Sequence, residues 1–321
     1  MKNNLVGTSS KRGILAASLL SLAVLVVSAQ PVLAQDLEEL LQQVGEEYAI
    51  SYSSPFLYAF GPNQNAGMYQ TASIPWSGLT FGVGLKMMAT HLNAEDQNFS
   101  KNIEDVDLGD FDPDYAGQTG DVVMSGPTIF GDTGTNGTVT GYLHGMEVFS
   151  NETIPGLVDT RFVPLMAPEA YVGGVLGLKA TIRYFPEMEM SDYGKTKYFG
   201  YGLQWSPNGL MPTFPVDLMV GFFTQELSVG TMLETNAKTY FLGASKSFTP
   251  FTVYGGFAKD ESDMSIKYEY LEENLDVSFD VDGRQENHFT VGAAMHFLLN
   301  LNVEMNVGDL VTYSGGLMFG F

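Results

Sequence analysis

The chain ends in the stretch Val311 to Phe321, V-T-Y-S-G-G-L-M-F-G-F, and this stretch decides the fold class. Side chains at every second position fall on the same side, which predicts a β-strand with one apolar face. The apolar face carries Val311, Tyr313, Leu317, Phe319 and Phe321, and the other face carries Thr312, Ser314, Gly316, Met318 and Gly320. Because an unpaired apolar edge promotes aggregation, we expect this strand to pair on both sides. It is the last strand either of a closed barrel or of a soluble sandwich.

The same residues also resemble a known sorting signal. An aromatic last residue, preceded by apolar residues at alternate positions, is similar to the assembly signal of bacterial outer-membrane β-barrels. Tyr313, Leu317, Phe319 and Phe321 carry the resemblance. It implies an outer-membrane location in a Gram-negative bacterium, with the barrel-assembly machinery, membrane lipid and lipopolysaccharide as partners.

The N-terminus has the three parts of a secretory signal peptide. Lys2, Lys11 and Arg12 form a basic region, an uncharged apolar run follows, and Val32-Leu33-Ala34 supplies small residues before a cleavage point. The apolar run is short for a transmembrane helix, which needs about 20 residues. We therefore assign residues 1–34 to a signal peptide that is removed before folding.

Composition excludes several classes of protein. The net charge is −22, and loss of three basic residues with the signal makes it −25, which argues against a nucleic-acid partner. The chain has no cysteine, so export without disulfides fits a closed hydrogen-bonded barrel. No later segment is apolar for long enough to predict a helical membrane span.

Asp36 to Ser53 is the best helical pattern of the mature chain, and we expect Pro55 to end it. Its apolar stripe consists of Leu37, Leu40, Leu41, Val44 and Tyr48. Residues 35–65 are expected to form a plug in a barrel or a cover at its periplasmic mouth, or alternatively a loosely packed leader. The plug hypothesis predicts that residues 36–60 restrict the lumen and that Glu38, Glu39, Glu46 and Glu47 meet basic side chains of the barrel wall.

Residues 66–321 contain ten segments with period-2 alternation, which predicts an all-β, transmembrane, antiparallel up-and-down β-barrel. Leu79 to Ala89 is the first clean strand. The acidic tract at 91–159 is expected to be a long outer loop, although Asp121 to Phe130 and Thr138 to Phe149 are either strands within it or an extra membrane hairpin. The count is therefore ten to twelve strands, and an even number places both termini in the periplasm.

The faces opposite the apolar ones predict the side chains that line the lumen. The candidates are Lys86, Lys179, Arg183, Gln204, Asp217, Met219, Phe223, Gln225 and Glu304. Mixed charges at these positions form either a salt-bridged interior or the lining of a narrow channel. A ten- to twelve-strand barrel lies between the side-chain-filled eight-strand barrels and the open porins, so its size does not decide between the two.

No motif predicts catalysis, a cofactor or a metal site. The four histidines lack zinc-ligand spacing. His288 has Ser262 and Ser278 as candidate neighbours for a lipid-acting serine enzyme, but no motif supports the pairing. The acidic cluster from Glu104 to Asp114 lacks the order of a calcium loop and is expected to be a solvated loop.

Several stretches resemble a family of uncharacterised outer-membrane barrel proteins of Gram-negative bacteria. They include P-T-I-F-G at Pro127 to Gly131, A-T-I-R-Y-F-P at Ala180 to Pro186 and T-V-Y-G-G at Thr252 to Gly256. A looser similarity is to the long-chain fatty-acid outer-membrane transporter family, which also places an N-terminal segment inside its barrel. The first resemblance covers most of the mature chain and implies the fold but no activity.

Three functions remain open from the sequence. The first is a passive channel or transporter for a small solute, which the inward Met88, Met219 and Phe223 suggest is apolar. The second is a structural or surface-interaction barrel whose acidic loops make the contacts. The third is a lipid-acting enzyme, although we expect no enzymatic activity.

Overall fold

The computed structural model describes residues 46–190, 194–229, 233–270, 275–297 and 299–320. The expected signal peptide, the stripe residues Leu37, Leu40, Leu41 and Val44, and the terminal Phe321 lie outside this part of the chain. No helix of the described residues is long and apolar enough to cross a membrane.

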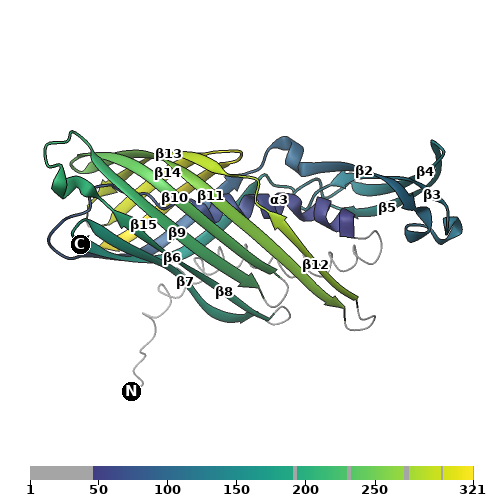
Figure 1. The fold of residues 1–321 in the computed structure, drawn as a ribbon, viewed down its shortest axis with the longest axis horizontal. Coiled ribbons are helices and arrows are strands. Elements are labelled where there is room, and N and C mark those ends of the chain that lie inside the picture. The colour runs from purple at the N-terminus through teal and green to yellow at the C-terminus, as the bar shows by residue number, and fades with distance from the viewer. Residues whose placement is uncertain (1–45, 191–193, 230–232, 271–274, 298, 321) are drawn as a thin grey trace, which may run out of the picture.

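Ten antiparallel strands close into a barrel (Figure 1). Each strand pairs with its neighbour along the barrel, β1 pairs with both β15 and β6, and the β10–β11 pairing completes the ring. The barrel strands are β1 (Thr80–His91), β6 (Phe162–Val175), β7 (Leu178–Met190), β8 (Gly194–Trp205), β9 (Asp217–Val229), β10 (Leu233–Phe248), β11 (Phe251–Tyr270), β13 (Asn287–His296), β14 (Asn300–Val307) and β15 (Val311–Gly320). The all-β barrel prediction, with its lower strand count of ten, is confirmed.

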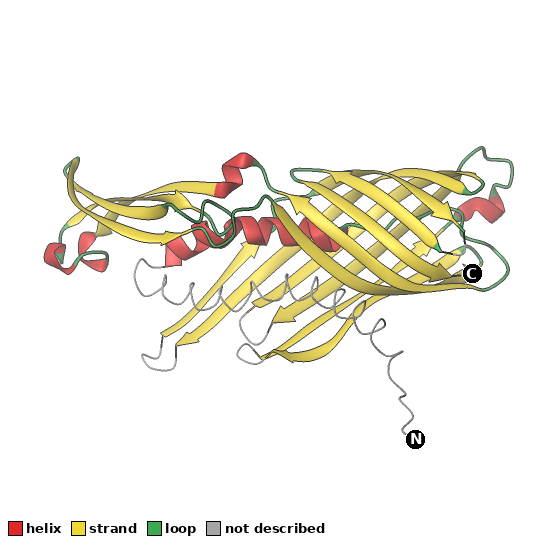
Figure 2. Ribbon diagram, turned by 180° about the vertical axis from the view of Figure 1, so that it is seen from behind, coloured by secondary structure: helices red, strands yellow, loops and turns green. Residues whose placement is uncertain are grey.

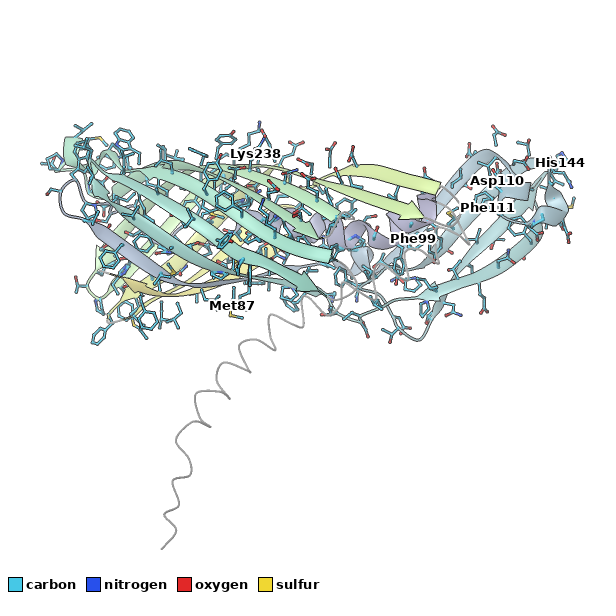
Figure 3. The ribbon with its side chains drawn as sticks, turned by 90° about the horizontal axis from the view of Figure 1, so that it is seen from below. Met87, Phe99, Asp110, Phe111, His144 and Lys238 are labelled. Atoms are coloured by element: carbon cyan, nitrogen blue, oxygen red, sulfur yellow. The ribbon has the colours of Figure 1, made fainter. Side chains whose placement is uncertain are left out.

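Alternation along each strand separates an apolar outside from a largely polar inside. In β1, Phe81 and Val83 are more than half exposed, whereas Lys86 and Met88 are buried. The closing strand follows the same rule, with Tyr313, Leu317 and Phe319 exposed and Ser314 buried. Figure 3 shows the labelled Met87 pointing away from the barrel. The period-2 pattern of the sequence therefore gave the correct face for the strands that it identified.

The two ends of the barrel differ. One end, called here the C-terminal end, holds Gly320, the turns at Leu176–Gly177 and Thr249–Pro250, and the connection that contains η4 (Pro207–Leu210). The other, called here the far end, holds the long connection from β1 to β6 and the ends of β7 and β9. At the far end β11 extends past β13 and pairs with β12 (Leu275–Asp282).

The acidic tract between β1 and β6 is folded rather than a plain loop. β2 (Asn98–Asp107), β3 (Thr119–Pro127), β4 (Asn136–Leu143) and β5 (Met146–Pro155) form a separate antiparallel sheet beyond the far end (Figure 2). Short helices η1 (Ala94–Gln97), η2 (Leu108–Asp110) and η3 (Pro113–Tyr115) connect it. The candidate strand at Asp121 to Phe130 corresponds to β3, whereas Thr138 to Phe149 spans β4, a turn and the start of β5. Both lie in this sheet, so the alternative of an extra membrane hairpin is wrong. The sheet buries its own apolar residues, including Val122, Met124 and Val139.

Helix α3 (Glu46–Asn65) connects this sheet to the barrel. It runs past Pro55, which was expected to end it. A proline in a helix leaves the carbonyl four residues earlier without its amide partner. Here that carbonyl belongs to Ser51, and the Ser54 hydroxyl is shared between the Ile50 carbonyl at 2.6 Å and the Ser51 carbonyl at 3.2 Å. The side chain at position 54 therefore replaces part of the lost hydrogen bond, and the helix continues to Asn65.

Candidate functional site in the barrel lumen

The first half of α3 packs against the far-end sheet. Tyr48 lies edge-on to Phe99 with ring centroids 4.9 Å apart, and its hydroxyl bonds that of Thr153. Glu47 forms an ion pair with Lys101 of β2. The helix therefore begins beyond the far end, on the side opposite Gly320, and not at the same mouth as the C-terminus. Of the predicted stripe, Tyr48 is described and is buried.

The last turns of α3 enter the lumen at the far end. Asn63 donates to the carbonyl of Val163 on β6 at 2.7 Å, and Gln64 donates to Thr235 on β10 at 3.0 Å. The Ala59 carbonyl accepts from Thr90 on β1 at 3.2 Å. Because these partners lie on different strands around the barrel, the helix end is held from several sides.

Residues 66–78, called here the lumen segment, continue through the barrel to the C-terminal end. The Gly67 amide donates to Glu304 on β14 at 2.6 Å, and Gln204 on β8 donates to the Met68 carbonyl at 3.1 Å. The Ala72 amide donates to Ser245 on β10 at 2.9 Å. At the C-terminal end the Trp76 indole donates to the Ser206 carbonyl at 3.0 Å. Gly67 has φ +76°, a conformation that favours glycine and that turns its amide toward Glu304.

Arg183 links the barrel wall by hydrogen bonds to the end of α3 and the start of the lumen segment. Its guanidinium donates to Glu169 on β6 at 2.9 Å and to the carbonyls of Gln64 and Ala66 at 3.2 and 3.0 Å. It also donates to Gln225 on β9 at 3.3 Å, and its side chain is fully buried. A planar guanidinium can bind several acceptors in fixed directions, which suits this junction of wall and segment.

The other lumen charges complete a mixed-sign cluster. Lys86 is fully buried and donates to Asn302 at 2.9 Å. Gln70 of the lumen segment donates to the second oxygen of Glu169 at 3.2 Å. The Lys179 ammonium lies 4.7 Å from the centre of the Tyr171 ring. The expected contacts between these cations and helix glutamates are wrong where described, because Glu47 instead pairs with Lys101 and the lumen carboxylates come from the barrel wall.

An aromatic layer fills the space beside the charges. Tyr69 of the lumen segment packs against Phe241 with centroids 4.7 Å apart and stacks on Tyr254 at 6.4 Å. Met219 and Phe223 join the same buried cluster. The polar cluster and the aromatic layer together occupy the middle of the barrel, so the lumen is closed in this structure.

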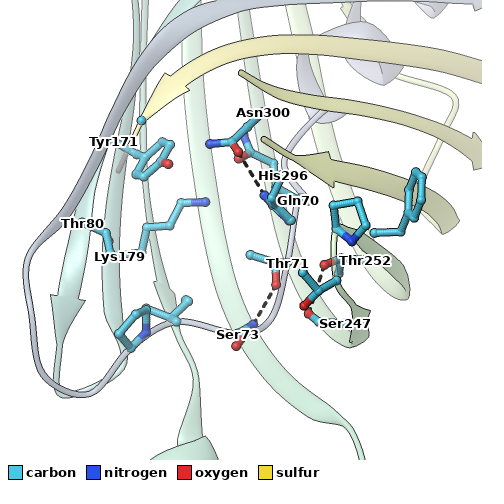
Figure 4. Close-up of a pocket in the computed structure, with 16 residues that line it drawn as sticks. Gln70, Thr71, Ser73, Thr80, Tyr171, Lys179, Ser247, Thr252, His296 and Asn300 are labelled. Atoms are coloured by element: carbon cyan, nitrogen blue, oxygen red, sulfur yellow. Dashed lines mark hydrogen bonds between the residues drawn. The ribbon is translucent and has the colours of Figure 1, made fainter. Parts of the chain in front are cut away.

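A cavity of about 400 Å³ remains at the C-terminal end (Figure 4). It lies on the C-terminal side of the aromatic layer, between the lumen segment and the barrel wall. Lys179 and Tyr171 line one side, and His296 and Asn300 line another. The turn at Thr249–Pro250, the start of β1 and the end of β15 also contribute to the lining.

A second buried polar group lies near the far end. The Asp260 carboxylate contacts His288 Nδ1 at 2.6 Å and accepts from Gln285 at 2.9 Å. His288 Nε2 is buried without a hydrogen-bond partner. The Ser262 hydroxyl lies instead against the backbone of Gly61 and Gly283. The described side chains thus give a His–Asp pair but no bond from His288 to a serine, and the Ser278 side chain lies outside them. Within the described residues, no three acidic or histidine side chains gather so that they could hold a metal ion.

The sequence located most of the lumen side chains. Eight of the nine candidates are buried inside the barrel: Lys86, Lys179, Arg183, Gln204, Met219, Phe223, Gln225 and Glu304. The ninth, Asp217, lies on the same inward row opposite Ser245 but is partly exposed at the C-terminal end, where Asn208 donates to it at 2.9 Å. The sequence analysis missed Glu169 as a lumen residue. Glu169 lies two residues from both Ala167 and Tyr171 on β6, so the period-2 pattern of this strand could have placed its side chain inward.

Comparisons with known structures find barrels of low similarity. OmpT in trimer form, an outer membrane protein of Vibrio cholerae, is 10% identical, with 76% of this chain and 99% of that chain covered and a TM-score of 0.25. The outer membrane protease OmpT from Escherichia coli is 10% identical over 78% and 98% of the two chains, with a TM-score of 0.27. A mutant porin of Rhodopseudomonas blastica is 12% identical over 76% and 99%, with a TM-score of 0.16. At these scores the functions of those proteins say nothing about this one.

Among curated proteins, none matches the sequence. One family model does match, and it covers residues 11–321, nearly the whole length of the chain. The chain therefore belongs to the family of unknown function DUF6588.

Proposed function

We propose that this protein is an outer-membrane barrel whose lumen is closed by its own N-terminal segment, and that a small solute passes only when that segment is displaced. The observation that carries the proposal is the buried Arg183 junction, in which one wall side chain holds the carbonyls of both Gln64 and Ala66. Covalent continuity of the segment with β1 keeps it available to close the barrel again.

The apolar outer face supports a membrane location. Exposed Leu, Val, Phe and Tyr side chains surround the barrel, and water exclusion by lipid is the condition under which such a surface is stable. Outer-membrane barrels have short periplasmic turns, which supports placing the C-terminal end in the periplasm and the β2–β5 sheet outside the cell. With that orientation α3 begins outside, whereas a periplasmic N-terminus was the expectation. Membrane lipid, lipopolysaccharide and the barrel-assembly machinery stay the proposed partners.

A second candidate function is surface interaction without transport. The β2–β5 sheet favours it, because the sheet projects beyond the barrel and is braced by α3. Figure 3 shows Asp110, Phe111 and His144 at its outer tip.

Two expectations from the sequence stay proposals: a similarity to long-chain fatty-acid transporters and the absence of enzymatic activity. Hydrolysis of a phospholipid vesicle by the purified barrel would contradict the second of them.

A disulfide that ties the lumen segment to the wall tests the passage proposal. Thr71 of the segment and Ser245 of β10 have their hydroxyl oxygens 3.4 Å apart, so cysteines at both positions face one another. The chain contains no cysteine of its own, which makes the engineered bond the sole disulfide. Solute flux through proteoliposomes is measured before and after reduction. We expect the oxidised Thr71→Cys/Ser245→Cys protein to be closed and reduction to restore the wild-type flux.

The matched control joins two residues of the far-end sheet. Thr140 and Ser150 are paired across β4 and β5 with hydroxyl oxygens 3.1 Å apart, and neither contacts the lumen. Their disulfide is expected to leave flux unchanged. Equal flux in the oxidised and reduced forms of the Thr71–Ser245 variant would refute a moving segment. Absence of any flux in the wild type would instead favour the surface-interaction function.

A further inference from the structure

We propose that the cavity at the C-terminal end binds a small organic anion, a short monocarboxylate, through the ammonium group of Lys179. The proposal deepens the proposed function, on which it rests, by naming the class of solute. Its basis is the juxtaposition of a buried, cavity-lining cation with a wall that offers hydrogen-bond donors but no carboxylate of its own.

Among the described residues Lys179 has no ion pair, although Glu169 is close enough to act on its charge through space. The three cations Lys86, Lys179 and Arg183 share this region with two carboxylates, Glu169 and Glu304. Burying a charge without a partner is costly, so an excess cation in a closed barrel favours the entry of an anion.

Both carboxylates are already engaged by other donors. Arg183 and Gln70 occupy the two oxygens of Glu169. At Glu304, the Gly67 amide and Asn306 donate to one oxygen, and Tyr254 lies 3.4 Å from the other. Among the described residues, Arg183 is therefore the one of the three cations that forms an ion pair, while Lys86 is held by the neutral Asn302. The third lumen carboxylate, Asp260, is held by His288 and Gln285 toward the far end.

Lys179 itself points into the cavity. Its chain crosses the face of Tyr171, and Figure 4 shows its ammonium extending into the space that Asn300 faces from the other side. The ammonium has three hydrogens to donate, and within the described residues no carboxylate lies within ion-pair distance of it. A cation–π contact is weak compared with an ion pair that is shielded from water, so Tyr171 positions the ammonium without neutralising it.

The rest of the cavity suits a carboxylate with a short body. The Asn300 side-chain oxygen lies 3.2 Å from His296 Nδ1, which directs the Asn300 amide hydrogens elsewhere, toward the cavity. Thr80, Thr252 and Ile74 are among the other lining residues, and no Asp or Glu is among the described ones. About 400 Å³ is the volume of roughly a dozen water molecules and falls at the small end of ligand pockets. A monocarboxylate of a few carbon atoms fits this volume.

A series of three probes of nearly equal shape tests the charge requirement on the wild-type protein. Butyrate, butyramide and n-butylammonium are titrated calorimetrically into the full-length mature barrel in detergent micelles. We expect butyrate to bind at least about tenfold more tightly than butyramide, the difference typical of one hydrogen bond to a charged group. We expect n-butylammonium not to bind. Equal affinity for butyrate and butyramide would overturn the proposal, and this comparison needs no variant to fold.

Variants then locate the site. Lys179→Met keeps the length of the side chain and removes its charge, and it is expected to lower butyrate affinity about tenfold to a hundredfold. Lys179→Arg keeps the charge and is expected to retain much of the binding. The matched control is Lys246→Met, because Lys246 also lies near the C-terminal end but on the exposed outer face. Unchanged binding by folded Lys179→Met protein, or an equal loss in Lys246→Met, would refute the site.

Different experimental results would refute the binding site and the passage proposal. Butyrate binding that depends on Lys179, in a barrel whose flux is insensitive to the Thr71–Ser245 disulfide, would support the site and refute the moving segment. Disulfide-sensitive flux with no preference for butyrate over butyramide, in flux or in binding, would support the segment and refute the site.

Discussion

Arg183→Met is the sharpest test of the closed lumen. The substitution removes the donor to Glu169, to Gln225 and to the carbonyls of Gln64 and Ala66. The Gln64 carbonyl keeps a second donor, the side-chain amide of Gln225. The heaviest loss therefore falls on Glu169, which is left with Gln70 as its hydrogen-bond donor.

The size of the effect follows from these contacts. Removing one partner of a buried ion pair costs about 3–5 kcal/mol, and a buried carbonyl that loses its donor costs about 1–3 kcal/mol. Lys86 and Lys179 are neighbouring cations that offset part of the charge left on Glu169. We therefore expect the free energy of unfolding to fall by about 3–5 kcal/mol rather than by the full sum.

Urea unfolding in detergent micelles, followed by tryptophan fluorescence, measures the loss. Lys238→Met is the control, because Lys238 lies on the exposed face of β10 and its loss is expected to cost less than about 0.5 kcal/mol. The double variant Arg183→Met/Glu169→Leu removes both charges. Its free energy of unfolding is expected to be about 1–3 kcal/mol higher than the sum of the two single effects predicts. A loss below about 1 kcal/mol for Arg183→Met, or strict additivity, would refute the role assigned to this junction.

Three further predictions use the same physical reasoning. Deleting Phe321 is expected to lower the yield of membrane-inserted barrel, scored by heat-modifiable migration on a gel; normal yield would make the aromatic end dispensable for assembly. Glu304→Gln weakens the acceptor of the Gly67 amide and is expected to lower the free energy of unfolding in urea by about 1–2 kcal/mol, less than Arg183→Met does. A larger loss for Glu304→Gln than for Arg183→Met would contradict this order of the two contacts. Burial raises the pKa of Tyr48 above its usual 10.0, so the phenol contributes stability that is full below pH 10 and is lost as the pH rises through the folded pKa. Amide exchange of α3 and the β2–β5 sheet is therefore expected to accelerate above about pH 10 in the wild type and to do so less in Tyr48→Phe; identical profiles would exclude the Tyr48 phenol as the cause.

The sequence by itself determined the barrel. Period-2 alternation is a property of neighbouring residues, because successive side chains of a strand point to opposite faces whatever lies beside it. Each of the ten spans could therefore be identified separately, and inward positions such as Lys86, Arg183 and Glu304 followed from the same pattern. The β2–β5 strands gave a weaker signal, since the alternation identifies strands without showing which sheet they join.

The tertiary structure alone decided how the lumen is filled. The contacts that place Gln64, Gly67 and Ala66 join residues more than a hundred positions apart, so no local pattern encodes them. The continuation of α3 through Pro55 is accompanied by packing against the far-end sheet, a tertiary contact that overrides the local preference of proline. That Lys179 has no ion pair among the described residues likewise follows only from the tertiary structure, because Arg183, Gln70 and Gly67 bind the carboxylate oxygens of Glu169 and Glu304.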